Sequence, residues 1–474
     1  MRRRDSSAPP KPRDLAILLL ALTGLVYLLS GPVFYGYDGE IMYRVSESVV
    51  LRHSIVISDP IYHYAQPYSP YGIATSLALL PFVALGQLLM HDPRALVIVY
   101  LPLVTALTVV ALNAVLVELG VVRTWAAALA LIYAFGTLAW HYSGVMFSEP
   151  LLGLMIILAL LSLLRFKRAG GARWLLLGAG AASGTAILAR DDSLLLVLPP
   201  FLIYAAVLSL QMRPNWPARA RDALAYLGPV AAAGLIALAY HLVRYGWGSG
   251  PYANDGIGFS QPFLGGLYGL LLSPGAGFLI YCPVLVVAFV GFVPFVKRWR
   301  AVALVVAAVV LLRLLFFASW WDWSGGATWG PRYMVPLIPL MMVPIAVAAG
   351  SWRRRLTVAL GAIGVGIEVV GQLVPYGLYY GAIVPQLAER MGICRCVPAP
   401  SQATRAIHNL MAFDWQYAPL VGQMQDLLHG VVAPAWGPIA TIAIPIVIVA
   451  VLGLGLQIWL LARRLEPVEL AEAA

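Results

Sequence analysis

The acids Asp38 and Glu40 follow the first long apolar stretch of the sequence and begin a segment with helical periodicity. Ile41, Val45 and Val49 recur every four residues, which predicts a short amphipathic helix with two acids in its first turn. At that position Asp38 can cap the helix and Glu40 can complement its dipole. Either carboxylate can also act as a general base, and both roles stay open at this point.

Two further acidic groups stand where apolar stretches end or begin. Glu149 directly precedes Pro150, a pair typical of a helix N-terminus, and Asp191 follows Arg190, with which it can form an ion pair. Carboxylates that meet at one place can instead hold a divalent cation, such as Mg, Mn, Ca or Zn, through oxygen ligands. Glu149 and Asp191 are therefore candidate metal ligands, and the sequence implies no other cofactor.

The segment Trp320–Tyr333 combines tryptophans, glycines and one arginine. An aromatic belt at a membrane interface accounts for the tryptophans, including Trp329. An arginine in a Gly-rich turn is also well placed to bind a phosphate with two N–H groups. Arg332 is thus the first candidate for binding a phosphate, with Tyr333 beside it, and Arg190 is the second.

The composition identifies an integral membrane protein. Of 474 residues, 61% are hydrophobic and 11% are charged, and the mean hydropathy is +0.84. A soluble domain carries about 25% charged residues, so that class is excluded. The formal charge of +10 lies in short clusters between apolar stretches and forms no patch for nucleic acid. Cys394 and Cys396 make no disulfide framework, and their role stays open.

The apolar stretches predict an all-α membrane bundle of about 12 spanning helices. The predicted spans are Leu15–Val33, Ala95–Val117, Trp125–Tyr142, Leu151–Leu164, Trp174–Ala189, Leu194–Leu210, Ala223–Val243, Phe278–Val296, Ala301–Ala318, Met334–Gly350, Leu356–Tyr376 and Gly437–Leu461. A further apolar stretch, Gly72–Met90, is interpreted as a helix in the outer interface, because only then do all the basic clusters fall on one side.

The basic clusters predict a protein of the plasma (inner) membrane with both termini in the cytoplasm. The expected organisation is a basic tail over residues 1–14, a membrane domain over 15–461 and a second tail over 462–474. No Ala-x-Ala site follows the first apolar stretch, so we expect it to remain as an anchor. The outer segments long enough to build a site are 34–94, 244–277, 319–333 and 381–436.

This pattern resembles the GT-C superfamily of membrane glycosyltransferases, which use polyprenyl-phosphate sugars. The branch it looks most like contains the protein O-mannosyltransferases and the lipid A aminoarabinose transferase. Glu40 and Tyr43 keep the spacing of the acids and tyrosine in that branch, and Glu149 in Ser-Glu-Pro matches its later acid. Asp38 and Glu40 are split by a glycine, whereas many relatives have adjacent acids, so which carboxylate is the base stays open.

The resemblance implies sugar transfer from a polyprenyl-phosphate donor to an acceptor hydroxyl at the extracytoplasmic face, with inversion. Asp38 or Glu40 would be the base, Arg332 would bind the phosphate, and Glu149 with Glu40 or Asp191 would hold any metal. The implied partners are the lipid-linked donor, a lipid, glycan or protein acceptor, and membrane lipids, without nucleic acid. The residues expected along the substrate groove are Tyr43, Tyr71, His63 and Trp329.

A transporter or flippase of a lipid-linked or anionic substrate is the alternative from another functional class. Such a protein would carry ionisable residues near the middle of its spans and would show two related halves. Arg313 and Glu368 are the charges that fall well inside predicted spans, and no matching halves are visible. The glycosyltransferase reading is therefore favoured.

Overall fold

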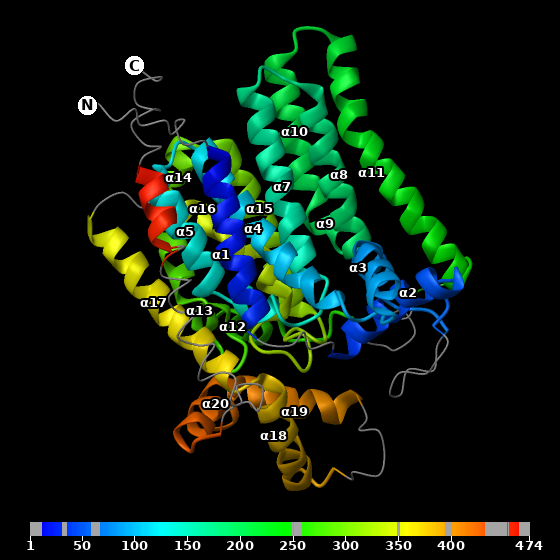
Figure 1. Cartoon of the computed structure of the whole chain (residues 1–474), viewed down its shortest axis with the longest axis vertical. Coiled ribbons are helices and arrows are strands. Elements are labelled where there is room, and N and C mark those ends of the chain that lie inside the picture. Colours follow the sequence, from blue (N-terminus) through cyan, green and yellow to red (C-terminus); the bar gives the residue numbers. More distant parts are fainter. Residues whose placement is uncertain are drawn as a thin grey trace, which may run out of the picture.

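The structure is a computed structural model that describes residues 12–30, 36–57, 67–248, 250, 258–347, 351–393, 401–431, 453 and 455–463. Every regular element in these residues is helical, which confirms the predicted all-α class (Figure 1). The elements are α1 (Pro12–Leu29), α2 (Gly36–Arg52), α3 (Ala74–Met90), η1 (Val97–Val99), α4 (Tyr100–Glu118), α5 (Arg123–Phe135), α6 (Ala139–Tyr142), α7 (Glu149–Arg168), α8 (Arg173–Ala189), α9 (Ser193–Leu196), α10 (Leu198–Met212), α11 (Trp216–Tyr245), α12 (Phe263–Leu272), α13 (Phe278–Tyr281), η2 (Pro283–Leu285), α14 (Val286–Arg298), α15 (Arg300–Ser319), η3 (Arg332–Leu337), α16 (Ile338–Ile345), α17 (Ser351–Leu373), α18 (Tyr376–Arg390), α19 (Ser401–Phe413), η4 (Trp415–Tyr417) and α20 (Pro419–Leu428).

Seven helices in the described residues are long and apolar enough to cross a membrane. They are Pro12–Leu29, Val97–Glu118, Glu149–Arg168, Ser193–Met212, Trp216–Tyr245, Arg300–Ser319 and Trp352–Leu373. Each of them coincides with a predicted span, so the chain is a multi-pass membrane protein. Most of the last predicted span, Gly437–Leu461, lies outside the described residues, as do Cys394 and Cys396.

Prolines divide two of the predicted spans, which was not foreseen. The stretch Phe278–Val296 forms α13, η2 and α14, and Pro283 opens the short 3-10 turn between them. The stretch that begins at Met334 is 3-10 helix through Leu337, with Pro336 inside it, and becomes α-helical afterwards. Proline lacks an N–H and clashes with the preceding turn, so a continuous α-helix is unfavourable there.

Helices α4 and α7 lie at the centre of the bundle, and α11 lies at its edge (Figure 1). In the apolar window of α7, 72% of the residues are buried by other protein groups, against 22% for α11. The exposed apolar side chains of α11 are those expected to face lipid. This central position of α7 fixes its first residue, Glu149, inside the protein.

Helices α2 and α3 lie together beside one end of α11, and α18, α19 and α20 form a separate layer below the bundle (Figure 1). Helix α3 packs against α2 and α8. The two helices expected after the first span are thus present. We call α18, η4, α19 and α20 the external cap, because the predicted outer segment 381–436 contains most of them.

Candidate functional site

Asp38 lies in the first turn of α2 and accepts hydrogen bonds from two residues of other segments. Tyr71 Oη donates to Asp38 Oδ1 at 2.6 Å, and Arg332 Nη1 donates to Asp38 Oδ2 at 2.8 Å. The helical spacing in the sequence explains the placement, because Ile41 and Val45 are buried in a small cluster against which Tyr71 packs. The apolar side of α2 thereby brings the tyrosine to the acid.

Arg332 opens η3 and is nearly buried, with 11% of its side chain exposed. The preceding turn contains Gly325 and Gly326 at φ +90° and +76°, a backbone region that favours glycine. This turn lies against the arginine: a Cβ at Gly325 would be 3.0 Å from Arg332 Cβ. The guanidinium lies over the Phe147 ring at 4.5 Å, so contacts on several sides hold the group that binds Asp38.

Glu149 is the first residue of α7 and is almost fully buried, with 1% of its side chain exposed. Arg190 Nη1 donates to Glu149 Oε1 at 2.7 Å, and Arg332 Nε forms an ion pair with the same oxygen at 3.5 Å. The positive end of the helix dipole also favours a carboxylate at this position. Glu149 therefore lies between two arginines and joins them.

The network continues from Arg190 to Asp192 and Arg313. Arg190 Nε donates to Asp192 Oδ2 at 3.0 Å, and Arg313 Nη1 donates to Asp192 Oδ1 at 3.3 Å. Burial alone would raise the pKa of the Asp192 carboxyl, but Arg190 and Arg313 together hold that pKa below its ordinary value. Six alternating charges thus run from Asp38 to Arg313, and we call them the Asp38 network.

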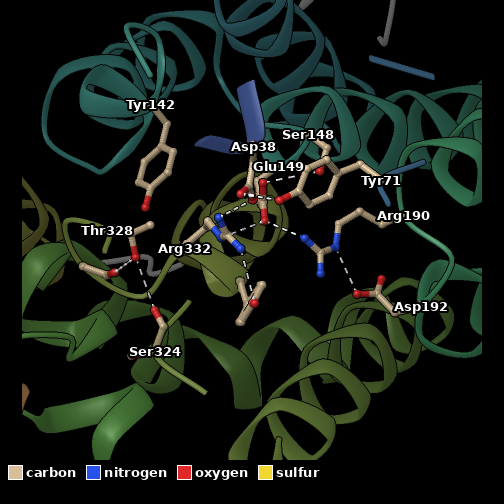
Figure 2. A network of polar contacts seen from close by, with 12 residues as sticks. Asp38, Tyr71, Tyr142, Ser148, Glu149, Arg190, Asp192, Ser324, Thr328 and Arg332 are labelled. Atoms are coloured by element: carbon tan, nitrogen blue, oxygen red, sulfur yellow. Dashed lines mark hydrogen bonds and ion pairs between the residues drawn. The ribbon is translucent and has the colours of Figure 1, made fainter. Parts of the chain in front are cut away.

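Figure 2 shows how residues from distant parts of the chain meet around Arg332. The members of the Asp38 network come from α2, the start of α7, the α8–α9 turn, α15 and η3. They are Asp38, Arg332, Glu149, Arg190, Asp192 and Arg313. Tyr333 stacks on Phe317 at 4.2 Å, and Arg190 and Arg332 lie over its ring at 4.9 and 5.0 Å. The two predicted phosphate-binding arginines therefore share one aromatic platform.

Two arginines of the network hold donors without hydrogen-bond partners among the described residues. Arg313 Nη2 is buried and donates no hydrogen bond there, and Arg332 Nε faces Glu149 Oε1 at 3.5 Å without the geometry of a hydrogen bond. A buried donor left unsatisfied is costly, so an acceptor is favoured next to it. An anion with several oxygens meets this requirement.

Glu40 belongs to a separate cluster on α2. Arg44 Nε donates to Glu40 Oε1 at 2.8 Å, and Arg94 Nη1 donates to Glu40 Oε2 at 3.0 Å, while Arg94 Nη2 also pairs with Oε1. Tyr43 is fully buried, donates to Glu47 at 2.8 Å, and has the Arg94 guanidinium 4.3 Å from its ring centre. Tyr43, predicted in the substrate groove, thus joins this Glu40 cluster.

The remaining predicted site residues lie elsewhere. Trp329 is fully buried; its indole N–H donates to Gln423 Oε1 of α20 at 2.7 Å, so it connects the turn before η3 to the external cap. His63 lies outside the described residues. Asp191 is exposed in the α8–α9 turn, away from the Glu149 carboxylate that its neighbour Arg190 binds.

The predicted metal ligands, Glu149 and Asp191, do not form a cation site in this structure. Glu149 faces two guanidinium groups, and Asp191 points to the surface. Across the described part of the chain, no three His, Cys, Asp or Glu side chains converge on one point. The divalent cation stays a prediction from the sequence, and no chemical step is derived from it.

Sequence reasoning missed the roles of Arg94 and Arg313. Arg313 was noted as a charge inside a span, and a buried charge in a membrane helix requires a partner, but the sequence did not identify Asp192 as that partner. Arg94 lies a few residues after an apolar helix, and no motif or spacing around it predicted a role. Glu368, the other charge inside a span, accepts a hydrogen bond from the backbone N–H of His141 at 3.0 Å.

Comparisons with known proteins connect this geometry to a fold. No protein-family model matches the chain, and no curated protein is similar to it in sequence. The chain is similar to the crystal structure of ArnT from Cupriavidus metallidurans in the apo state, with a TM-score of 0.50, 16% identity, and coverage of 87% of this chain and 77% of that one.

The same ArnT bound to undecaprenyl phosphate matches with a TM-score of 0.48 and 16% identity, covering 88% of this chain and 78% of that one. The apo oligosaccharyltransferase from Archaeoglobus fulgidus gives 0.44 and 12%, with 87% and 55% covered. At these identities, the similarity to apo ArnT shows the fold. The chain therefore has the fold of apo ArnT.

Proposed function

We propose that this protein is a glycosyltransferase that moves a sugar from a polyprenyl-phosphate donor to an acceptor hydroxyl, with inversion. The observation that carries the proposal is the contact of Asp38 with Arg332, which places a carboxylate beside a buried arginine network. The GT-C fold supports the reaction class. ArnT has also been solved with undecaprenyl phosphate, a lipid of the chemistry we propose as the carrier.

In the proposed reaction, Asp38 accepts the proton of the acceptor hydroxyl while that oxygen attacks the anomeric carbon. The bond from this carbon to the phosphate oxygen breaks on the opposite face, and its electron pair leaves with the lipid phosphate. The products are the glycosylated acceptor and polyprenyl phosphate, and the proton passes from Asp38 to water. Each Asp38 oxygen accepts one hydrogen bond, from Tyr71 or from Arg332, and retains a lone pair for this role.

The arginines would stabilise the leaving phosphate, whose negative charge grows as the bond to the sugar breaks. Preorganised donors aimed at developing charge are the largest contribution to many enzymatic rates. Arg332 contacts Asp38 and Glu149 together, so it can lie between the proton acceptor and the leaving group. The unsatisfied N–H groups of Arg332 and Arg313 support an anion at this place.

We place the reaction at the extracytoplasmic face of the plasma membrane, with both termini in the cytoplasm. The asymmetric distribution of Lys and Arg between apolar stretches supports this orientation. A polyprenyl chain would lie in the bilayer and present its phosphate at the interface. Lipid, glycan and protein hydroxyls all reach that side of the membrane.

The test uses purified protein in lipid nanodiscs, a panel of radiolabelled polyprenyl-phosphate sugars and a membrane extract as acceptor. Transfer of label from one donor, retained in Glu40→Gln and lost in Asp38→Asn, would support the proposal and identify the sugar. NMR of the product would then report the anomeric configuration, and a parallel assay with EDTA would test the predicted cation.

A well-folded protein that neither uses nor binds any donor of a broad panel would overturn the proposal. The transporter alternative would then be tested by following movement of a fluorescent polyprenyl phosphate across proteoliposomes. Retention of configuration in the product would reject the single displacement at the anomeric carbon, while leaving the transferase class intact.

A further inference from the structure

A cavity of about 190 Å³ lies between the Trp320–Arg332 turn and helix α19 of the external cap. Its walls include two tryptophans, one acid, one arginine, one histidine and one amide. These residues are Trp321, Asp322, Trp323, Arg405, His408 and Asn409. Pockets for drug-sized ligands span about 300–1,000 Å³, so this cavity suits a single ring.

The polar groups of the cavity are fixed by contacts with their neighbours. Trp323 Nε1 donates to Asn409 Oδ1 at 3.3 Å, and Arg405 Nη2 donates to Gln261 Oε1 at 3.2 Å. The Trp321 indole N–H is buried and has no hydrogen-bond partner among the described residues.

The cavity lies next to the Asp38 network, on its outer side. The turn from Asp322 to Gly326 packs against Arg332, and the charges of Arg332 and Asp38 both act on the Asp322 carboxylate. In Figure 2, Ser324, which lines the cavity, and Arg190 lie on opposite sides of Arg332. The cavity therefore lies across Arg332 from Arg190.

We propose that this cavity binds a sugar ring of the acceptor, so that the acceptor is a glycan. Asp322 and Asn409 accept hydrogen bonds from its hydroxyls, and the Trp321 indole packs on its apolar face. This inference rests on the proposed function and specifies its acceptor. The location in the external cap, across Arg332 from the second phosphate-binding arginine, favours the acceptor over the donor sugar.

The first test measures binding without any donor, so it does not depend on turnover. Saturation-transfer NMR would be recorded for the full-length protein in nanodiscs with methyl glycosides of glucose, mannose, galactose and arabinose. We expect saturation of one glycoside, lost in Trp321→Leu and retained in Trp415→Leu. Trp415 is a matched control because it is 59% exposed on the same cap. No saturation of any glycoside in the wild type would overturn the proposal.

The second test separates the two substrates kinetically, once a donor is known. Asp322→Asn should raise the acceptor KM about tenfold, the equivalent of one hydrogen bond to a charged group, with donor KM changed less than twofold. Asp426→Asn on α20 is the matched control and should leave both values unchanged. Trp321→Phe, which keeps an aromatic face without the N–H, provides a milder variant if Trp321→Leu does not fold.

Two results would overturn the assignment of a glycan acceptor, one from the kinetic test and one from the NMR test with a serine-containing peptide added to its panel. A change in donor KM with unchanged acceptor KM would assign the cavity to the donor sugar. Saturation of a serine-containing peptide in place of every glycoside would assign it to a protein acceptor. Failure of the transferase itself would appear separately, as wild-type protein that binds a glycoside but uses no donor.

Discussion

Asp38 and Glu40 stand two residues apart on α2, yet they belong to different structures. Residues two apart on a helix do not face each other, so the two carboxylates point to different neighbours. Asp38 contacts Arg332, which is 294 residues away in the chain. Glu40 contacts Arg44, one helical turn later, and Arg94. Asp38 therefore binds an arginine from a distant part of the chain, whereas Glu40 binds an arginine of its own helix and Arg94.

The difference in partners predicts a difference in function. The Asp38 network links six charges, and Glu149 within it is 1% exposed, so a change at one member alters the electrostatics of the others. In the Glu40 cluster, the Arg44 and Arg94 side chains are 29% and 38% exposed, so solvent screens their ion pairs. We therefore assign chemistry to Asp38 and positioning of α2 to Glu40.

The largest effect is expected for Asp38→Asn. Loss of the proposed general base should lower the transfer rate by about a thousandfold, because such groups contribute about 10²–10⁴. The measurement is label transfer in nanodiscs, with a thermal unfolding scan to show that the variant folds. Turnover within tenfold of wild type would remove Asp38 from the role of base and reverse our assignment of the two acids.

Glu149→Gln should destabilise the protein by about 3 kcal/mol, because removing one partner of a buried ion pair leaves an uncompensated charge. Arg190 and Arg332 are the arginines left behind. Added polyprenyl phosphate would supply the missing negative charge, so its stabilising shift in Tm should exceed that of the wild type. An equal shift in both proteins would mean that the phosphate binds away from these arginines.

Arg332→Lys should lower the transfer rate by about a hundredfold, the cost of removing one donor at a site of developing charge. A lysine keeps the charge but loses the planar guanidinium, which contacts Asp38 and Glu149 together. Arg94→Lys in the Glu40 cluster is the matched control and should stay within a few-fold of wild type. Similar losses in the two variants would contradict the distinction between the clusters.

Glu40→Gln should cost about 1 kcal/mol or less, since its ion pairs are partly exposed. Transfer activity should fall by less than about threefold, a free-energy change within that range. Thermal unfolding and label transfer measure the two quantities together. A hundredfold loss of activity without loss of stability would make Glu40 the base.

The last prediction concerns the pH dependence of glycoside binding in the acceptor cavity. The pKa of Asp322 is raised to about 6, because burial and the charge of Asp38 raise it more than Arg332 and Arg405 lower it. Its negative charge is therefore lost as pH falls below about 6, so glycoside affinity should weaken about fivefold between pH 7 and pH 5. Burial lowers the pKa of His408 to about 4, so that neighbour stays neutral over this range.

The effect of Asp322 on stability has the opposite sign. Because its folded-state pKa lies above the unfolded value of about 3.9, its stabilising contribution is complete at low pH and is lost as pH rises through 6. An NMR titration of the glycoside at both pH values, repeated on Asp322→Asn, separates binding from stability. A pH dependence that persists in the variant would assign the titration to another group.

Several local features could be predicted from the sequence. Ile41 and Val45 predicted α2, and Pro150 predicted the start of α7 at Glu149, because helical periodicity and capping are properties of neighbouring residues. The pairing of Asp192 with Arg313, 121 residues apart, could not be predicted in this way. The burial of Tyr43 could not be predicted either, because the residue type does not indicate which side of α2 other segments cover.

The sequence by itself determined the membrane class, the seven long spanning helices of the described residues and the acidic and basic groups near their ends. Those properties follow from hydropathy, periodicity and charge, which act over one or two helical turns. The tertiary structure decided that Arg332 contacts Asp38 and that Arg94 contacts Glu40. The reason is that the packing of separate helices decides which charges share a low-dielectric interior. Ion pairs are strong enough to be selective only in such an interior.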